Sequence, residues 1–209
     1  MTYKTEQESF WASEFGSEYV NRNQVTEALH STGLAFWTKV LALTNSRPAS
    51  FLELGANIGR NLRALHDIFG SLARLDAVEI NPDAAACLRQ WGKASVHETS
   101  MLEFDSQDQW DFVFTSGVLI HINPASLPDI YRRMHRLSRR YIMVNEYYNP
   151  TPVEVPYRGH AQRLFKRDFA GELMEMFPDL SVRGYGFFWR RDPIFPGGDD
   201  CTWFLLEKR

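Results

Sequence analysis

The most constraining feature of this chain is a regular alternation of short apolar runs with longer amphipathic segments between residues 50 and 146. We expect strands at residues 50–54, 74–80, 94–97, 110–116 and 140–146, and helices at 58–69, 82–91 and 124–137. Strands that alternate with helices in this way form crossover units, which build a parallel, doubly wound sheet. Two later apolar runs, at 180–189 and 202–208, can pair as a hairpin. The sequence therefore predicts an α/β fold whose mostly parallel sheet has an antiparallel last strand.

The segments outside this alternation predict further helices and one long connection. We expect a short amphipathic helix at 4–14, a loop at 14–23, and helices at 25–43 and 166–177. No internal repeat or low-complexity linker divides the 209 residues, so a single domain over residues 1–209 is expected. Within it, residues 1–45 would form N-terminal helices that act as a lid, residues 46–209 the α/β core, and residues from about 147 to 166 a substrate loop.

Charge and composition narrow the classes of partner. The formal net charge is -3, so the chain has no overall positive field to attract nucleic acid or an anionic membrane. The N-terminus is polar, and no apolar run approaches the length that spans a bilayer. Cys87 and Cys201 lie far apart and form no CxxC motif, which favours reduced thiols. We therefore expect a cytoplasmic protein that binds neither nucleic acid nor a membrane.

The turn after the first predicted strand, Gly55-Ala-Asn-Ile-Gly59, lies where doubly wound sheets bind their ligands. A dinucleotide site would require G-x-G-x-x-G, but Asn57 occupies the place of the second glycine. Glu53 precedes the turn, and a carboxylate there would repel a phosphate. An ammonium or sulfonium ligand fits better, and S-adenosylmethionine carries both groups and no phosphate.

The ends of the next strands extend this ligand site. Glu79 follows Gly55 by 24 residues, roughly the offset at which an acid binds ribose hydroxyls in this architecture. Ser100 could then bond the edge of an adenine ring, and Met101 could cover its face. Aromatic side chains near the N-terminus could cover a sulfonium, although packing of the N-terminal helix is an equal alternative. The expected contacts with S-adenosylmethionine are Trp11, Tyr19, Arg22, Glu53, Gly55, Asn57, Gly59, Asn61, Glu79, Ile80, Ser100, Met101, Thr115 and Ser116.

These motifs resemble a known family. The segments Glu53–Gly59 and Asp111–Ile122, together with Glu79, look like the successive motifs of class I methyltransferases. More narrowly, nearly the whole chain resembles the methylases associated with pseudaminic acid biosynthesis. That resemblance is carried by residues 8–23, 117–124, 145–160 and 164–171. It implies a Rossmann-like, seven-stranded class I fold with an antiparallel seventh strand, and S-adenosylmethionine as methyl donor. One departure is visible, because Leu137-Ser-Arg-Arg-Tyr141 replaces the usual Pro-Gly-Gly turn before the fifth strand.

Candidates for handling the methyl acceptor follow the fourth and fifth strands. Possible bases or orienting groups are His121, Glu146, Tyr148 and His160, and possible acceptor contacts are Tyr147 and Arg158. The alternatives are helix capping by His121, solvation of the strand end at Glu146, and a purely structural role for Arg158.

The expected function is transfer of a methyl group to a small-molecule amine or hydroxyl, with a sugar or nucleotide-sugar as one candidate acceptor. No His, Cys, Asp or Glu cluster has metal-ligand spacing, so an N- or O-methyltransferase without a metal is expected. The alternatives are methylation of RNA or protein, weakly favoured by the arginines between 132 and 140, and a non-catalytic protein that binds S-adenosylmethionine. Either a monomer or a homodimer fits the sequence.

Overall fold

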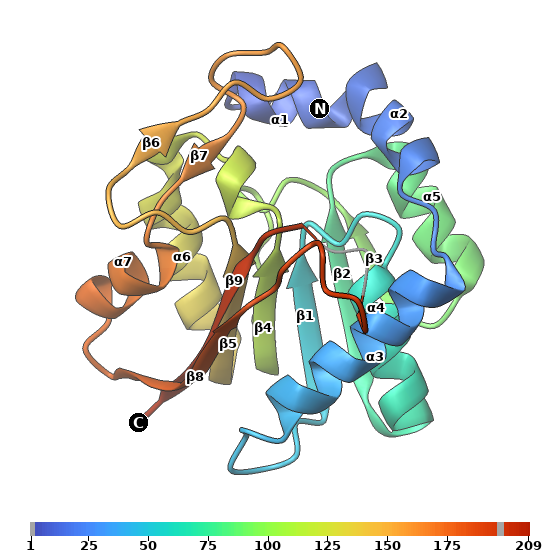
Figure 1. Cartoon of the computed structure of the whole chain (residues 1–209). Helices are drawn as coiled ribbons and strands as arrows, with labels where there is room; N and C mark the ends of the chain where they lie inside the picture. The colour runs from blue at the N-terminus through green and yellow to red at the C-terminus, as the bar shows by residue number, and fades with distance from the viewer. Residues whose placement is uncertain (1–2, 196–198) are drawn as a thin grey trace.

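A seven-stranded sheet forms the centre of the protein (Figure 1). The computed structural model describes residues 3–195 and 199–209. The strand order is β3-β2-β1-β4-β5-β9-β8. The strands are β1 (Ser50–Leu54), β2 (Arg74–Glu79), β3 (Ser95–Glu98), β4 (Trp110–Ser116), β5 (Ser138–Glu146), β8 (Leu180–Phe187) and β9 (Thr202–Lys208). The first five pair in parallel, whereas β9 is antiparallel to both of its neighbours. The predicted mixed sheet with an antiparallel last strand is therefore confirmed, with β8 as the edge strand.

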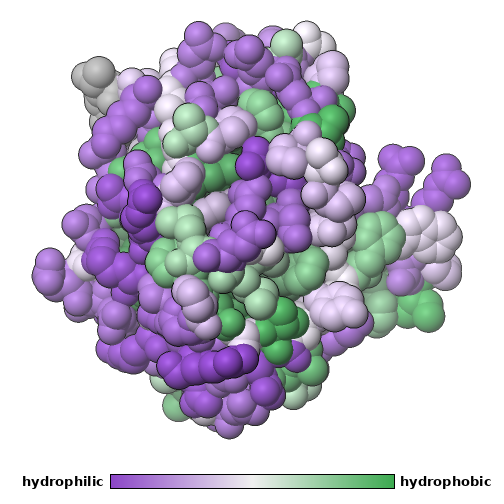
Figure 2. Space-filling model, turned by 90° about the vertical axis from the view of Figure 1, so that its left-hand side faces the viewer, coloured by the Kyte–Doolittle hydropathy of each residue, from purple (hydrophilic) through white to green (hydrophobic). Residues whose placement is uncertain are grey.

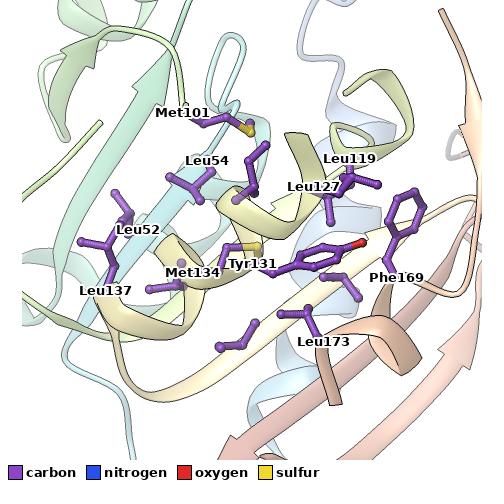
Figure 3. Close-up of a cluster of buried hydrophobic side chains, with 14 of the residues drawn as sticks. Leu52, Leu54, Met101, Leu119, Leu127, Tyr131, Met134, Leu137, Phe169 and Leu173 are labelled. Atoms are coloured by element: carbon purple, nitrogen blue, oxygen red, sulfur yellow. The ribbon is translucent and has the colours of Figure 1, made fainter. Parts of the chain in front are cut away.

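Helices cover both faces of this sheet because alternate strand residues are buried on opposite sides. Phe51 and Phe112 pack on one face with α3 (Glu27–Leu41), α4 (Arg60–Phe69) and α5 (Pro82–Trp91). Leu52 and Val113 pack on the other face with α6 (Leu127–Leu137) and α7 (Phe169–Met176). Figure 3 shows this second cluster, in which Tyr131 and Met134 of α6 point toward Leu173 and the strands. Consecutive apolar residues occur in β1 and β4, at 51–52 and 112–114, because both faces of these strands are covered.

Two boundaries differ from the sequence prediction. The segment predicted as a loop at 14–23 is helix α2 (Glu14–Arg22), so that prediction is wrong. Gly16 suggested a loop, but a Cβ at this position would lie 1.9 Å from the carbonyl oxygen of Trp11. The glycine therefore permits a close helix contact rather than a turn.

The helix predicted at 166–177 begins later than expected. Phe165–Lys166 form strand β7, which pairs with β6 (Val153–Glu154), and α7 begins only at Phe169. Asp168 caps α7 by accepting the backbone N–H of Gly171 at 2.9 Å, which fixes the helix start three residues after the predicted one. At its own start, α6 is preceded by a 3-10 turn at Pro124–Ser126.

The N-terminal helices lie over the carboxyl ends of the parallel strands (Figure 1). α1 (Glu6–Ala12) begins with a capping box, in which Thr5 accepts the backbone N–H of Glu8 and Glu8 accepts that of Thr5. The side chain of Asn81, at the end of β2, donates to the carbonyl oxygen of Trp11 at 3.1 Å. The β6–β7 hairpin approaches the same edge. None of the helices in the described part of the chain is long and apolar enough to cross a membrane.

Candidate functional site

Two adjoining cavities lie at the carboxyl ends of β1, β2 and β4. The smaller has a volume of about 140 Å³ and extends toward the end of β3. The larger has a volume of about 420 Å³ and extends toward α3 and β5. Both are lined by Tyr19, Gly55, Asn57, Ser116, Gly117 and His121. One elongated ligand can therefore occupy parts of both cavities and leave room in the larger one for a second molecule.

The predicted glycine turn forms the floor between the cavities. Gly55 has φ 78°, and a Cβ there would lie 2.6 Å from Cγ2 of Val118. Gly59 has φ 79°, and its Cβ would meet Leu88 at 2.5 Å. Asn57 also adopts a left-handed conformation, with φ 48°. Glycine is required at both ends of the turn because its backbone is left-handed there and lies against neighbouring side chains.

Glu79, at the end of β2, joins the glycine turn to the turn that follows its own strand. Its carboxylate accepts the backbone N–H of Asn57 at 2.6 Å and that of Asn81 at 2.8 Å. Burial raises the pKa of Glu79, and these backbone donors oppose the rise. The residue also lines the smaller cavity, where its remaining lone pairs can accept hydroxyl groups of a ligand.

Glu53 lies at the start of the glycine turn and lines the larger cavity. Asn61 donates to its Oε1 at 2.7 Å and itself accepts the indole N–H of Trp37 at 3.3 Å. Within residues 3–195 and 199–209, Oε2 of Glu53 is buried without a hydrogen-bonding partner. Burial raises the pKa of this carboxyl to about 8. A cationic group in the cavity would supply the missing donor and favour the carboxylate.

The far end of the smaller cavity is formed by the residues that follow β3 and by helix α1. Ser100, Met101 and Ile80, three of the residues expected to contact S-adenosylmethionine, line it. Glu8 and Gln7 of α1 also line it, and sequence reasoning missed both. The capping box at Thr5 could have located Glu8 on a helix, but nothing local indicated that the helix lies over β3.

Aromatic side chains close the cavities from above. The Trp11 ring centroid lies 4.6 Å from that of His121, 5.2 Å from that of Tyr19 and 6.2 Å from that of Tyr157. The indole nitrogen of Trp11 is buried, and no partner for it occurs among the described residues. Trp11 and Tyr19 therefore form part of the cavity wall, in addition to packing α1 against α2.

His121 is held in one tautomer by the chain that returns beside it. Its Nδ1 lies 2.5 Å from the carbonyl oxygen of Arg163. Because a carbonyl oxygen only accepts, Nδ1 carries the proton and Nε2 keeps its lone pair. Burial lowers the pKa of His121 to about 4, so the ring is neutral near pH 7. The side chain lines both cavities and offers them a neutral acceptor.

Glu146 is buried at the end of β5 but lines neither cavity. Its carboxylate accepts the backbone N–H of Val118 at 2.9 Å and that of Ile120 at 3.4 Å. Burial raises its pKa to about 7, and the backbone donors oppose the rise. In this structure Glu146 fixes the loop that carries His121, whereas the sequence suggested that its carboxylate binds the acceptor.

The other predicted residues divide between the cavities and their surroundings. Tyr147 and Asn61 line the larger cavity. Tyr148 is exposed beside Phe204, and Arg22 pairs with Glu18 at 3.2 Å on the surface. Thr115 is buried within β4 and lines neither cavity.

Arg158 and His160 belong to a tight turn. Tyr157 and His160 exchange backbone hydrogen bonds of 2.8 and 2.9 Å, and Arg158 and Gly159 both have positive φ. These angles are typical of a two-residue hairpin turn. The turn brings His160 against Phe10 and Phe15 of the lid, at 5.1 and 5.8 Å between ring centroids, rather than into either cavity.

The larger cavity also contains residues that sequence reasoning missed, namely Phe36, Asn145, Phe188, Asp199 and Cys201. Oδ1 of Asn145 is buried and has no partner in the described part of the chain, while Nδ2 donates to Ser116 at 3.0 Å. Burial and the neighbouring Asp199 raise the pKa of Tyr147. Asn145 directly precedes the predicted Glu146 and Tyr147, whereas the other four come from distant segments that no local motif connects with the site.

The arginines between 132 and 140 are largely occupied by neighbours. Arg132 pairs with Asp129, Arg136 with Asp105 and Arg139 with Asp111. On the side of the molecule shown in Figure 2, hydrophilic and hydrophobic residues are interspersed. Among the residues that the structure describes, no group of three or more His, Cys, Asp or Glu side chains is placed to hold a metal ion.

The sheet order, the reversed β9 and the ligand-sized cavities over the glycine turn define the class: this is a class I methyltransferase fold. Residues 51–140 match the family model described as a methyltransferase domain. Among curated protein sequences, none matches the chain.

Solved structures with the same fold include several methyltransferases. One is the Burkholderia thailandensis 1,6-didemethyltoxoflavin-N1-methyltransferase with bound 1,6-didemethyltoxoflavin and S-adenosylhomocysteine, at 22% identity over 100% of this chain and 91% of that chain, with TM-score 0.71. A second is the plantazolicin methyltransferase BpumL in complex with a pentazolic desmethylPZN analogue and S-adenosylhomocysteine, at 15% identity over 97% of this chain and 94% of that chain, with TM-score 0.67. A third is the magnesium protoporphyrin IX methyltransferase of Synechocystis PCC 6803 with bound S-adenosylmethionine, at 10% identity, 100% coverage of both chains and TM-score 0.69.

Proposed function

We propose that this chain transfers a methyl group from S-adenosylmethionine to a small-molecule amine or hydroxyl held in the larger cavity. The observation that carries the proposal is the pair of cavities with a common wall, one placed for an adenosine and the other for a methionine group and an acceptor. The methyltransferase domain match at residues 51–140 supports the same reaction. The solved methyltransferases with this fold bind S-adenosylmethionine or its demethylated product.

The donor site runs across the strand ends. Glu79 would accept the ribose hydroxyls, and Glu53, fixed by Asn61, would accept the ammonium group. Ile80 and Met101 would cover the base, while Trp11 and Tyr19 would cover the ligand from the lid. When bound, S-adenosylmethionine supplies an electrophilic methyl group on a sulfonium.

The acceptor would lie beyond Ser116, toward β5. Among the described residues that line the larger cavity, Glu53 and Asn145 carry buried oxygens without partners. They belong to β1 and β5, which are separated by β4 and so lie about 10 Å apart. With the ammonium group assigned to Glu53, the oxygen of Asn145 is available to an N–H or O–H of the acceptor. Phe36, Tyr147 and Phe188 would supply apolar contact area.

His121 would orient the acceptor or receive its proton. Its neutral Nε2 can accept a hydrogen bond from an acceptor N–H or O–H, and the Arg163 carbonyl keeps that lone pair available. Glu146 would be a positioning residue that holds the loop at 118–120. In-line transfer would depend mainly on this alignment and on exclusion of water by the lid.

Several finer points belong to the same proposal. The resemblance to methylases associated with pseudaminic acid biosynthesis supports a sugar or nucleotide-sugar acceptor, and we propose transfer to nitrogen or oxygen without a metal. We further propose a single domain over residues 1–209, with residues 1–45 as the lid and about 147–166 as the substrate loop. A cytoplasmic monomer or homodimer that does not bind nucleic acid completes this proposal.

Calorimetry and mass spectrometry test the proposal in two steps. The purified chain should bind S-adenosylhomocysteine, and Glu79→Ala should weaken binding by about tenfold or more because ribose hydroxyls lose a charged acceptor. Extracts incubated with the enzyme and isotopically labelled donor should then yield a small metabolite with a labelled methyl group. Absence of binding by the wild type would refute the donor assignment. Labelling of RNA or protein, or of nothing, would refute the acceptor class.

A further inference from the structure

The end of the smaller cavity beyond Glu79 is where the base of the donor would lie. Gly55, Glu79 and Ser100 follow β1, β2 and β3, and neighbouring strands are about 4.8 Å apart. A ligand with its methionine group at Gly55 and its ribose at Glu79 therefore places its adenine beside Ser100. This placement of the base rests on the proposed function.

The carboxylate of Glu8 lies at this position although it belongs to the lid. The residue is 5% exposed and lines the smaller cavity. Its Oε2 accepts the backbone N–H groups of Lys4 at 2.8 Å and Thr5 at 2.9 Å. Its Oε1 accepts the hydroxyl of Ser100 in a short contact. Oε1 can accept a second donor, because each carboxylate oxygen has two lone pairs.

The hydroxyl of Ser100 is already committed. Its single proton is donated to Glu8, and its oxygen accepts the backbone N–H of Leu102 at 3.0 Å. The sequence suggested that Ser100 itself would bond the adenine edge. In the structure its clearest role is to hold Glu8 in the wall of the cavity.

The chemistry of the base selects among the possible contacts. The exocyclic 6-amino group is the hydrogen-bond donor on the edge of adenine, and its ring nitrogens are acceptors. A carboxylate only accepts, so it pairs with the amino group and would be repelled by the ring nitrogens. We infer that Glu8, carried by helix α1, recognises the 6-amino group of the donor's adenine, with Ser100 as its positioning residue.

This contact would couple recognition of the base to the position of the lid. α1 is joined to the sheet through Asn81 and Trp11, and Glu8 adds a bond to the ligand itself. A donor that lacks the amino group would bind more weakly and would leave α1 less firmly attached. Selection of adenine and closure of the lid would thus depend on the same side chain.

A comparison of two ligands tests the inference. S-adenosylhomocysteine and its 6-deamino analogue, in which hydrogen replaces the amino group, are titrated calorimetrically into the full chain. The wild type should prefer S-adenosylhomocysteine by about tenfold, since the analogue leaves a buried carboxylate oxygen without its donor. Glu8→Gln should bind the two ligands with affinities within about twofold of each other, as expected when two contacting groups are removed in turn. Glutamine also serves in a capping box, so α1 should keep its start in this variant.

Glu6→Gln provides a matched control because Glu6 is an exposed acid on the same helix, and it should retain the tenfold preference. Ser100→Ala should reduce the preference without abolishing it. Equal affinity of the wild type for the two ligands would overturn the inference without any variant, and so would a Glu8→Gln protein that keeps the preference. If the wild type binds neither ligand, the proposed function itself fails, so the two failures are distinguishable.

Discussion

The side-chain amide of Asn61 donates to Oε1 of Glu53 at 2.7 Å, while Oε2 of the same carboxyl is buried without a partner in the described residues. One oxygen is thus fixed by the protein, and the other is available to a ligand in the larger cavity. This arrangement raises the pKa of Glu53 to about 8, because burial disfavours the charge more than one amide donor favours it.

Binding of the donor product should therefore release a proton near pH 7. In the free protein Glu53 is mostly protonated at this pH, and the ligand's ammonium group would lower its pKa and displace the proton. Calorimetric titration with S-adenosylhomocysteine, repeated in buffers of different ionisation enthalpy, measures the number of protons released. We expect a value approaching about one at pH 7, which becomes smaller toward pH 9 as free Glu53 ionises.

Glu53→Gln is the direct control for that titration because glutamine does not titrate. It should bind more weakly and release almost no proton. Equal proton release from the variant and the wild type would assign the effect to another group and contradict the role of Glu53.

The stability of the free protein should fall as pH rises from about 5 to 8. The carboxyls of Glu53 and Glu146 have folded-state pKa values of about 8 and about 7, above their ordinary value of 4.5. Below pH 4.5 both carboxyls are protonated in the folded and in the unfolded protein. Between pH 4.5 and the folded-state pKa they stay protonated only in the folded protein, so the free energy of unfolding falls as pH rises. The expected loss is on the order of a few kcal/mol, measured by denaturant unfolding at several pH values.

Glu53→Gln should lose clearly less unfolding free energy between about pH 5 and 8. Glu175 is an exposed acid on α7, so Glu175→Gln should behave as the wild type. If Glu53→Gln loses stability with the same pH dependence as the wild type, the raised pKa of Glu53 is not the cause.

The parts of the site that follow a strand directly were predictable, whereas the parts supplied by distant segments were not. β1 and the glycine turn were located from sequence because their apolar residues, Glu53, Gly55 and Gly59 all lie within one short segment of the chain. The segment 14–23 was misassigned because Gly16 and polar residues locally favour a loop. Its helix is supported by a tertiary contact, because the side-chain amide of Asn81 donates to the hydroxyl of Ser17, 64 residues earlier in the chain. Glu8 and Asp199 were missed for the same reason, since only the folded chain brings them to the cavities.

Replacement of Glu146 should loosen the loop that precedes His121. Glu146→Ala removes the carboxylate oxygen that accepts the backbone N–H groups of both Val118 and Ile120. Leaving a buried backbone donor unpaired costs about 1–3 kcal/mol, so the free energy of unfolding should fall by this amount. Because Glu146 lines neither cavity, KM for the donor should change less than kcat. A variant with wild-type stability and kcat would remove the proposed positioning role.

His121 is the decisive residue for acceptor chemistry. Two substitutions distinguish the roles of its two ring nitrogens. His121→Asn can still donate to the carbonyl oxygen of Arg163 from the place of Nδ1, but it offers nothing at the place of Nε2. We expect kcat to fall by about 100-fold, as for other residues that accept a proton or orient its donor, while affinity for S-adenosylhomocysteine changes by about threefold or less. His121→Gln can place an amide oxygen near the former Nε2 and should recover part of the rate if orientation matters more than proton acceptance. Since burial lowers the pKa of His121 to about 4, its protonation should not shape the kcat profile between pH 5 and 8. An ionisation near pH 6.5 in the kcat profile of the wild type that disappears in both variants would show that His121 is solvated and charged during the reaction. An unchanged kcat in both variants would exclude His121 from binding or deprotonating the acceptor.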